Sequence, residues 1–410
     1  MTQVEYRKLG KSGLRVSVPI LGMMSMGCRF FHFTTGFLFE LKTNKKKKQS
    51  AIIGRSAKTN IYIFFFFFFR FQASKWEPWV LDREEALPIL KRAYDLGITT
   101  WDTANAYSNG ISEKLIGEAI QRYSIPREEI VILTKIYYPV PPESEKPGDA
   151  FLVDLRQHAK YVNQFGLSRG AIFKQVDACL KRLNTDYIDL LQIHRYDKSI
   201  EPEEVMEALH DLVKSGKVRY IGASSMWLYE FARLQHVAEL RGWTTFVSMQ
   251  NIYNLLYREE EREVIPFSNL TGVGLTPWSP LHQGILARPI DNTAADAATA
   301  TVTATAPVAT ADGKKSLRTS TSTGVFKQLE LDVSGKEIVR RLEQVANKRD
   351  WSMAVTALVW LTGKVVSPVV GINSIKRLEE VIEINGKSLT DEEIKYLEEP
   401  YTPQQIFGHF

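Results

Sequence analysis

The stretch Ile98-Thr-Thr-Trp-Asp-Thr-Ala-Asn-Ala-Tyr107 begins as a short apolar run and ends in polar residues. The same design returns in Ile-Leu-Thr-Lys135 and in Leu-Leu-Gln-Ile-His194. Short apolar runs of this kind are typical of buried strands. The sequence therefore predicts three strands that carry Asp102, Lys135 and His194 at their ends, with Tyr107 shortly after the first strand.

Similar apolar runs alternate with amphipathic helical patterns along most of the chain. Eight such alternations favour a (β/α)8 TIM barrel over a doubly wound sheet. Helix ends carry their usual signals, because Asp82 can cap a helix with Glu85 three residues later, and Gly97 can end that helix. The predicted strands are 18–21, 98–101, 130–133, 187–193, 218–221, 246–250, 272–275 and 365–370. The predicted helices are 84–96, 112–123, 169–183, 203–215, 228–241, 259–268, 336–348, 352–361 and 375–384.

The positions of the polar residues agree with a barrel. Such barrels carry their chemistry at the C-terminal ends of the strands, where the predicted strands place Asp102, Lys135, His194, Ser224 and Gln250. No Gly-x-Gly-x-x-Gly follows a predicted strand and no phosphate-binding Gly-Lys-Ser/Thr loop is present. Rossmann and P-loop interpretations therefore lose their main support.

The four residues Asp102, Tyr107, Lys135 and His194 suggest the reduction of a carbonyl group. A phenol with an ordinary pKa of about 10 is a poor proton donor near neutrality unless a cation stabilises its phenolate. We interpret Tyr107 as the proton donor, Lys135 as the cation that lowers its pKa, Asp102 as the partner of Lys135, and His194 as a hydrogen-bond donor to the substrate oxygen. None of these groups carries hydride, so a nicotinamide cofactor is implied.

Each residue alone has a simpler structural interpretation. Asp102 could be a turn or cap residue, Tyr107 a packed aromatic, Lys135 a solvated charge and His194 a satisfied imidazole. Together they make the chain resemble an aldo-keto reductase, similar to the fungal aryl-alcohol dehydrogenase and versiconal hemiacetal acetate reductase group. The resemblance covers residues 6–27 and about 74–385. It implies that these four residues form the catalytic tetrad of the family.

The resemblance also implies a cofactor site for NADPH rather than NADH. It assigns the nicotinamide carboxamide to Ser224, Ser225 and Gln250, and stacking on the nicotinamide to Trp278. It places Ser279 and Leu281 at the pyrophosphate, and it counts Gly284 among the cofactor-binding residues. It assigns the 2′-phosphate to Ser374 and Arg377 and the adenine side to Glu380. Strand-end caps, a core tryptophan and a solvated basic turn at 376–377 remain the alternatives. Val381 and Gln283 depart from the family pattern.

Composition predicts one domain over residues 1–410, with two insertions. Of the 410 residues, 44% are hydrophobic and 24% charged, as in an ordinary globular protein. Cys28 and Cys179 give neither a disulfide framework nor a metal site, and we expect a cytoplasmic protein. The N-terminus lacks the apolar core of a signal peptide, and no uncharged apolar stretch is long enough to span a membrane.

Two segments fit no regular pattern. Residues 28–72 contain Lys45 to Lys48 and Phe64 to Phe69, and hold nine Lys or Arg against one Glu. The segment therefore has a net charge of +8. Because the whole chain has a formal net charge of +5, the remaining residues have a net charge of −3. The basic charge is thus local, and no nucleic-acid partner is expected. We interpret it as translated intron, with a disordered loop or a membrane-touching or targeting insert as rivals. Residues 291–324, rich in Ala, Thr and Ser, predict a low-complexity loop, with a lid over the cofactor as the alternative.

Aromatic residues near the predicted catalytic loops suggest a small aromatic or polyketide-like carbonyl substrate, although core or lid packing would explain them equally. They are Trp76, Trp79, Tyr137, Tyr138 and Trp227, and the long loop 138–166 is expected to shape the pocket. Two other functions remain open. One is a non-catalytic regulatory module that binds NADPH, and the other is a product inactivated by the 28–72 insertion.

Overall fold

The computed structural model describes residues 3–27, 29–30, 73–74, 79–142, 155–290 and 331–409. The body of the 28–72 insertion, the 291–324 loop, Trp76 and residues 143–154 of the long loop lie outside these ranges. Two short strands mark the ends of the insertion, one just inside its start and one directly after its last residue. β4 (Arg29–Phe30) pairs antiparallel with β5 (Ala73–Ser74), so the chain leaves and re-enters the fold at one place.

Eight parallel strands form one continuous sheet, in the order β11-β10-β9-β8-β7-β6-β3-β12. Backbone hydrogen bonds join its two ends, because the N–H groups of Val366 and Val369 donate to the carbonyls of Leu275 and Pro277 at 3.1 and 2.9 Å. The predicted (β/α)8 barrel is confirmed. The strands are β3 (Ile20–Gly22), β6 (Thr100–Asp102), β7 (Val131–Ile136), β8 (Ile188–Ile193), β9 (Val218–Ser224), β10 (Ser248–Gln250), β11 (Gly274–Leu275) and β12 (Val369–Gly371).

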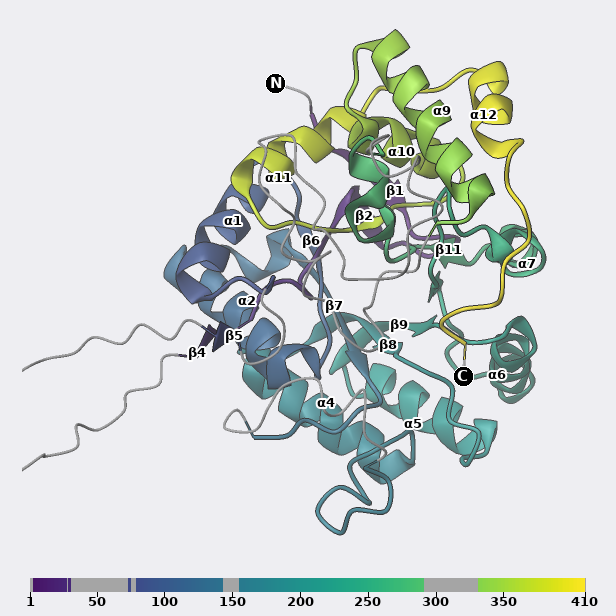
Figure 1. Ribbon diagram of the computed structural model, residues 1–410. Helices are drawn as coiled ribbons and strands as arrows, with labels where there is room; N and C mark the ends of the chain where they lie inside the picture. The colour runs from purple at the N-terminus through teal and green to yellow at the C-terminus, as the bar shows by residue number, and fades with distance from the viewer. Residues whose placement is uncertain are drawn as a thin grey trace, which may run out of the picture.

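Helices surround the sheet (Figure 1). The predicted capping box of the first helix is present, with Asp82 and Glu85 as its two members, and Gly97 follows the helix in a left-handed conformation with φ +87°. No helix in the described ranges is long and apolar enough to cross a bilayer. The helices are α1 (Arg83–Asp95), α2 (Ile111–Arg122), α4 (Arg169–Leu183), α5 (Pro202–Lys214), α6 (Leu228–Arg241), α7 (Val264–Thr271), α9 (Val333–Arg349), α10 (Met353–Thr362), α11 (Ile375–Val381) and α12 (Asp391–Glu398).

The barrel interior is apolar at one end and polar at the other. Leu133 and Leu190 belong to a buried cluster with Leu9, Val16, Ile20 and Val369. Side chains two positions apart on a strand point to the same face, so Lys135 and Gln192 continue the same inward rows toward the C-terminal ends of β7 and β8. The apolar layer thus forms a floor beneath the polar residues.

An N-terminal hairpin covers the floor of the barrel, and the sequence did not predict it. Its strands are β1 (Glu5–Lys8) and β2 (Arg15–Val18). The predicted strand 18–21 is therefore wrong at its start: β2 ends at Val18, Pro19 has no N–H to donate, and β3 begins at Ile20. Likewise, only the end of the predicted strand 365–370 is regular, because β12 begins after Pro368.

Several predicted elements also begin or end at other residues in the structure, and two predicted helices are divided or shortened. The predicted helix 259–268 divides into a 3-10 turn, η3 (Glu259–Glu261), and α7. Tertiary contacts hold the acidic residues of η3, since Glu259 accepts hydrogen bonds from the Tyr401 hydroxyl and the Gln404 N–H at 2.7 and 2.8 Å. The predicted helix 375–384 ends in the 3-10 turn η7 (Ile382–Ile384), and α12 was not predicted.

Candidate active site

The structure brings the four predicted catalytic residues together at the C-terminal ends of adjacent strands. Asp102 ends β6, Lys135 lies in β7, and His194 follows β8. The Lys135 Nζ lies 2.5 Å from Asp102 Oδ1, 2.9 Å from the Thr103 carbonyl oxygen and 5.3 Å from the centre of the Tyr107 ring. The ring of His194 meets that of Tyr107 edge to face, with centroids 5.9 Å apart. All four side chains are buried.

The charges in this cluster are set by burial and by one another. Burial lowers the pKa of Lys135, but the Asp102 carboxylate and Tyr107 together raise it by more than burial lowers it. The net pKa of Lys135 is therefore raised, and its amine stays an ammonium. For Tyr107, burial raises the pKa, and the charge and hydrogen bond of Lys135 oppose that rise without cancelling it. Burial and the charges of Lys135 and Arg195 hold the pKa of His194 well below its usual range, so the imidazole is neutral at neutral pH.

These pKa directions correct one expectation. Lys135 lowers the pKa of Tyr107, as predicted, but the net pKa lies above the ordinary value because burial of the phenol outweighs the ammonium. Tyr107 therefore keeps its proton at neutral pH. The ammonium's effect is to make the phenolate less costly than burial alone would allow.

Sequence reasoning missed Gln192, which binds the other oxygen of Asp102. Gln192 Nε2 and Gln250 Nε2 donate to Asp102 Oδ2 at 3.0 and 2.8 Å, and Gln250 Nε2 also donates to Gln192 Oε1 at 3.1 Å. With Lys135 on Oδ1, the carboxylate is fixed on both sides. One signal for Gln192 was available: it lies two residues before His194, on the same inward face of β8.

Two of the predicted carboxamide residues, Gln250 and Ser225, are fixed by hydrogen bonds to their neighbours. Both N–H groups of Gln250 are used by Asp102 and Gln192, and its Oε1 accepts no hydrogen bond from the residues that the structure describes. An amide N–H₂ is the donor that such an oxygen fits. Ser225 is held by its neighbours, because its N–H donates to Asn251 Oδ1 at 2.7 Å and its Oγ accepts from Trp278 Nε1 at 3.1 Å.

Ser224 behaves as the strand-end alternative predicted. Its Oγ donates to the Gln250 carbonyl at 2.7 Å and lies 3.2 Å from the Ser225 Oγ, so it links the ends of β9 and β10. Trp278, by contrast, is only partly buried and is no core tryptophan. The segment after β11 contains several residues in the left-handed conformation. One is Ser279, and two more, Gln283 and Gly284, lie within the 3-10 turn η4 (His282–Ala287). Leu281 is the N-cap of η4.

The residues predicted to bind the 2′-phosphate and the adenine side lie at and along α11. Ser374 caps α11 by accepting the Arg377 N–H, and Arg377 Nη1 donates to Asn373 Oδ1 at 2.7 Å. Burial and then the charge of Arg377 lower the pKa of Arg288. The sequence did not predict Arg288. Glu380 lies in the last turn of α11.

The C-terminal tail, residues 401–409, also reaches the site and was not predicted (Figure 1). Phe407 lies 6.4 Å from Trp278 between ring centroids. Arg195 donates to the Gly408 carbonyl, and His409 Nε2 lies 3.2 Å from Glu260 Oε1 and 3.3 Å from Asn251 Nδ2. Because Asn251 also holds Ser225, the tail is connected to the predicted nicotinamide site.

The turn after Tyr107 is packed against Gly27, the residue directly before the insertion. Ser108 and Asn109 have φ of 49° and 53°, and Gly110 has φ of 86°. A Cβ on Gly27 would lie 2.0 Å from the Ser108 Oγ and 2.6 Å from its Cβ. The insertion therefore begins directly beside the turn that carries Tyr107.

This close approach gives a stability prediction. Gly27→Ala should lower the free energy of unfolding by about 1–3 kcal/mol, because overpacking forces the surrounding backbone to shift. Gly170→Ala is the matched control, since a Cβ there meets nothing within 4 Å, and it should leave stability unchanged or slightly raised. Chemical denaturation of both variants measures the difference. Equal stabilities would show that Ser108 moves aside freely.

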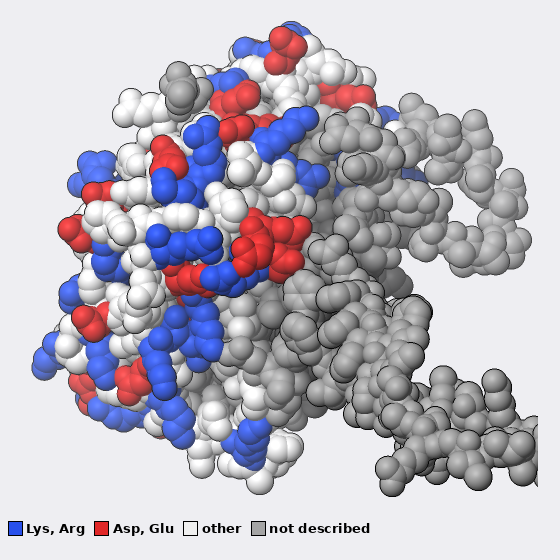
Figure 2. Space-filling view, turned by 90° about the vertical axis from the view of Figure 1, so that its left-hand side faces the viewer, with Lys and Arg blue, Asp and Glu red and all other residues white. Residues whose placement is uncertain are grey.

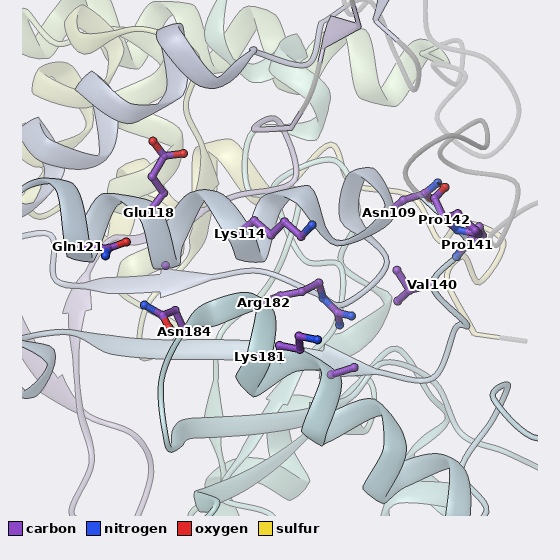
Figure 3. Close-up of a pocket in the computed structure, with 12 residues that line it drawn as sticks. Asn109, Lys114, Glu118, Gln121, Val140, Pro141, Pro142, Lys181, Arg182 and Asn184 are labelled. Carbon is purple, nitrogen blue, oxygen red and sulfur yellow. Dashed lines mark hydrogen bonds between the residues drawn. The ribbon is translucent and has the colours of Figure 1, made fainter.

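A cavity of about 680 Å³ lies elsewhere, between α2 and α4 (Figure 3). Asn109, Lys114, Pro142, Lys181 and Arg182 are among its lining residues, and none of the four predicted catalytic residues lines it.

The face shown in Figure 2 bears Lys and Arg interspersed with Asp and Glu.

Comparison with known proteins shows the family. The aldo/keto reductase family model matches residues 71–401. An aldo-keto reductase of Metarhizium robertsii is 44% identical over 412 residues, covering 100% of this chain and 94% of that protein. A putative aryl-alcohol dehydrogenase of Schizosaccharomyces pombe is 44% identical over 407 residues (98% and 97%), and the versiconal hemiacetal acetate reductase of Aspergillus parasiticus is 39% identical over 406 residues (98% and 98%). The chain therefore belongs to the aldo/keto reductase family and is an oxidoreductase that acts on carbonyl and alcohol groups.

Proposed function

We propose that this protein uses NADPH to reduce an aromatic or polyketide-derived aldehyde or ketone to the alcohol, with Tyr107 as the general acid. One observation carries the proposal: a buried ammonium, Lys135, is bound by Asp102 and lies against the Tyr107 ring at the C-terminal ends of the barrel strands. This is the arrangement that proton donation to a carbonyl oxygen requires.

Each residue of the cluster has one task in this reaction. NADPH, when bound, supplies the hydride. Tyr107 gives its phenolic proton to the carbonyl oxygen, and Lys135 stabilises the phenolate that remains. Asp102 holds the Lys135 ammonium in place, and the neutral His194 donates a hydrogen bond to the same oxygen. Because the cluster is buried, each of these interactions is stronger than it would be in water.

The residues around Ser225 fit the nicotinamide end of the cofactor. Gln250 Oε1 can accept from a carboxamide N–H₂, and the partly buried Trp278 indole, fixed by Ser225, presents an aromatic face nearby. These residues would hold and orient the ring. Orientation alone contributes substantially to a transfer between two bound groups.

The exposed guanidinium of Arg377 at the start of α11 supports NADPH over NADH. A guanidinium is well suited to bind a phosphate, and only NADPH carries the 2′-phosphate. Arg377→Ala should weaken NADPH binding about 10- to 100-fold and NADH binding far less, because hydrogen bonds to charged groups contribute about 1.5–3 kcal/mol. Lys376→Ala removes the neighbouring exposed charge and serves as the control. Titration of the quenching of protein fluorescence by each cofactor measures this. An equal loss for NADPH and NADH would contradict the assignment.

Aromatic side chains beside the catalytic cluster support an aromatic substrate. Tyr138 meets the His194 ring edge to face with centroids 5.5 Å apart, and Tyr137 and Phe165 lie 5.0 and 6.0 Å from Tyr138. Trp227 lies 5.0 Å from His409, at the C-terminal tail. Aromatic rings pack favourably in such edge-to-face arrangements. The names of the fungal relatives, an aryl-alcohol dehydrogenase and a versiconal hemiacetal acetate reductase, support the same class.

A cytosolic location fits the buried free thiol of Cys179.

NADPH oxidation by the purified chain over a panel of aromatic aldehydes and anthraquinone-type ketones tests this function. We expect turnover with at least one member of the panel. A chain that binds NADPH but reduces none of them would favour the regulatory module instead. A variant lacking residues 28–72 tests whether the insertion inactivates the enzyme. Turnover that appears only in this variant would show that the insertion beside Tyr107 disables catalysis.

A further inference from the structure

A buried ion pair lies outside the catalytic cluster, between α2 and α4. Arg182 Nε donates to Glu113 Oε2 at 2.6 Å, and the Glu113 side chain has no exposed surface. Glu113 Oε1 accepts a further hydrogen bond from the Thr134 hydroxyl at 2.6 Å. Burying two charges carries a desolvation penalty, so such a pair adds little stability compared with apolar residues of the same volume. Its presence points to a role other than stability.

The pair contacts both chain segments that carry the reacting groups. Thr134 immediately precedes Lys135 in β7, and its side chain points outward to Glu113 while that of Lys135 points inward. Arg182 lies across Gly110, where a Cβ would meet its Cδ at 2.5 Å and its Nε at 2.9 Å. Gly110 lies three residues after Tyr107. Figure 3 shows Arg182 reaching from α4 toward the end of α2 where Asn109 lies.

The turn between Tyr107 and α2 needs such support. Ser108 and Asn109 both adopt left-handed conformations, which are unfavourable for residues with a side chain and persist only when their surroundings impose them. Gly27 packs against Ser108 on one side, and Arg182 packs against Gly110 on the other. Ser112, at the start of α2, adds a hydrogen bond of 2.8 Å between its Oγ and the Thr103 Oγ1.

We propose that the Glu113–Arg182 ion pair is a positioning device that fixes Tyr107 relative to Lys135. Arg182 packs on Gly110 in the Tyr107 turn, and Glu113 accepts a hydrogen bond from Thr134 in the Lys135 strand. The ion pair therefore fixes the positions of both segments relative to each other. The inference rests on the proposed function of Tyr107 as proton donor. Neither Glu113 nor Arg182 touches substrate or cofactor in this proposal.

The test is a double variant, Glu113→Leu with Arg182→Met, which removes both charges and leaves no unpaired ion in the core. It should fold, unfold at nearly the same temperature and bind NADPH as the parent does. Its kcat should fall by about 100-fold, because small misplacements of reacting groups cost that much, while KM changes little. Glu118→Leu with Arg83→Met removes an exposed ion pair between α2 and α1, and should leave kcat unchanged. A folded Glu113→Leu/Arg182→Met protein with parental kcat would overturn the proposal.

A second measurement does not depend on turnover. With 3-fluorotyrosine at position 107, the ¹⁹F resonance reports the surroundings of that ring directly. We expect one sharp resonance in the parent and a shifted or divided resonance in the double variant. An unchanged resonance would overturn the positioning role even if the protein reduced no carbonyl on the panel. If the double variant does not fold, Arg182→Lys is measured in the same way, since its side chain cannot both reach Glu113 as a guanidinium does and cover Gly110.

Discussion

Tyr107→Phe is expected to lower kcat for carbonyl reduction by about 10²- to 10⁴-fold, the usual contribution of a positioned general acid. The phenol is the group placed to donate a proton, and phenylalanine keeps the ring while removing that proton. NADPH binding should stay nearly unchanged, because the proposed cofactor contacts lie on Ser225, Gln250, Trp278 and the α11 region. Steady-state rates with a saturating aromatic aldehyde, together with NADPH binding, measure both effects.

Tyr138→Phe is the matched control for this variant. Tyr138 also packs edge to face on His194, and Tyr138→Phe removes a phenolic hydroxyl close to the one that Tyr107→Phe removes. Its loss should act mainly on KM, since we place Tyr138 in the substrate pocket and not at the proton transfer. Retained turnover in Tyr107→Phe, or equal losses of kcat in the two variants, would show that the proton comes from another group.

Lys135→Met is expected to be at least as damaging and to change the pH dependence. Burial raises the pKa of Tyr107, and the Lys135 ammonium is the main force that opposes the rise. Without it, the phenolate loses its stabilising charge, so kcat for reduction should again fall by about 10²- to 10⁴-fold. The phenol is the reactive form in reduction and is lost above its pKa. The alkaline decline of kcat should therefore move to higher pH in the variant.

Stability provides a separate check on Lys135. Lys135→Met leaves the Asp102 carboxylate buried without its ammonium partner, which should cost about 3–5 kcal/mol of unfolding free energy. Adding Asp102→Asn removes the unpaired charge and should restore most of the stability, but not the activity. Chemical denaturation and rate measurements on the single and double variants distinguish these effects. A double variant that recovers turnover would contradict the role of the ammonium.

The barrel and the residues at the ends of its strands could be predicted because both follow from short-range patterns. A buried parallel strand reads as an apolar run, and the first polar residue after it marks the catalytic end of the barrel, as for Asp102 and His194. The hairpin at residues 5–18 was missed because its strands are only four residues long and β1 has no fully buried residue. Pro19 and Pro368 then shifted the boundaries of the strands that follow them.

The remaining parts of the site depend on contacts that are distant in sequence. Gln192 binds Asp102 across 90 positions, and His409 contacts Asn251 across 158. No local pattern encodes such pairings. The net pKa of Tyr107 was mispredicted for a related reason, because the sequence shows the nearby lysine but not how deeply the phenol is buried. The functional assignments of the cofactor residues stay predictions, supported by the contacts of Gln250 and Ser225.

The most direct measurement replaces Tyr107 with 3,5-difluorotyrosine, whose phenol is more acidic, and records kcat for reduction against pH. If this phenol donates the proton, the alkaline decline of kcat will move to lower pH by the amount that fluorination lowers the phenol pKa. A decline that stays at the same pH would contradict proton donation by Tyr107.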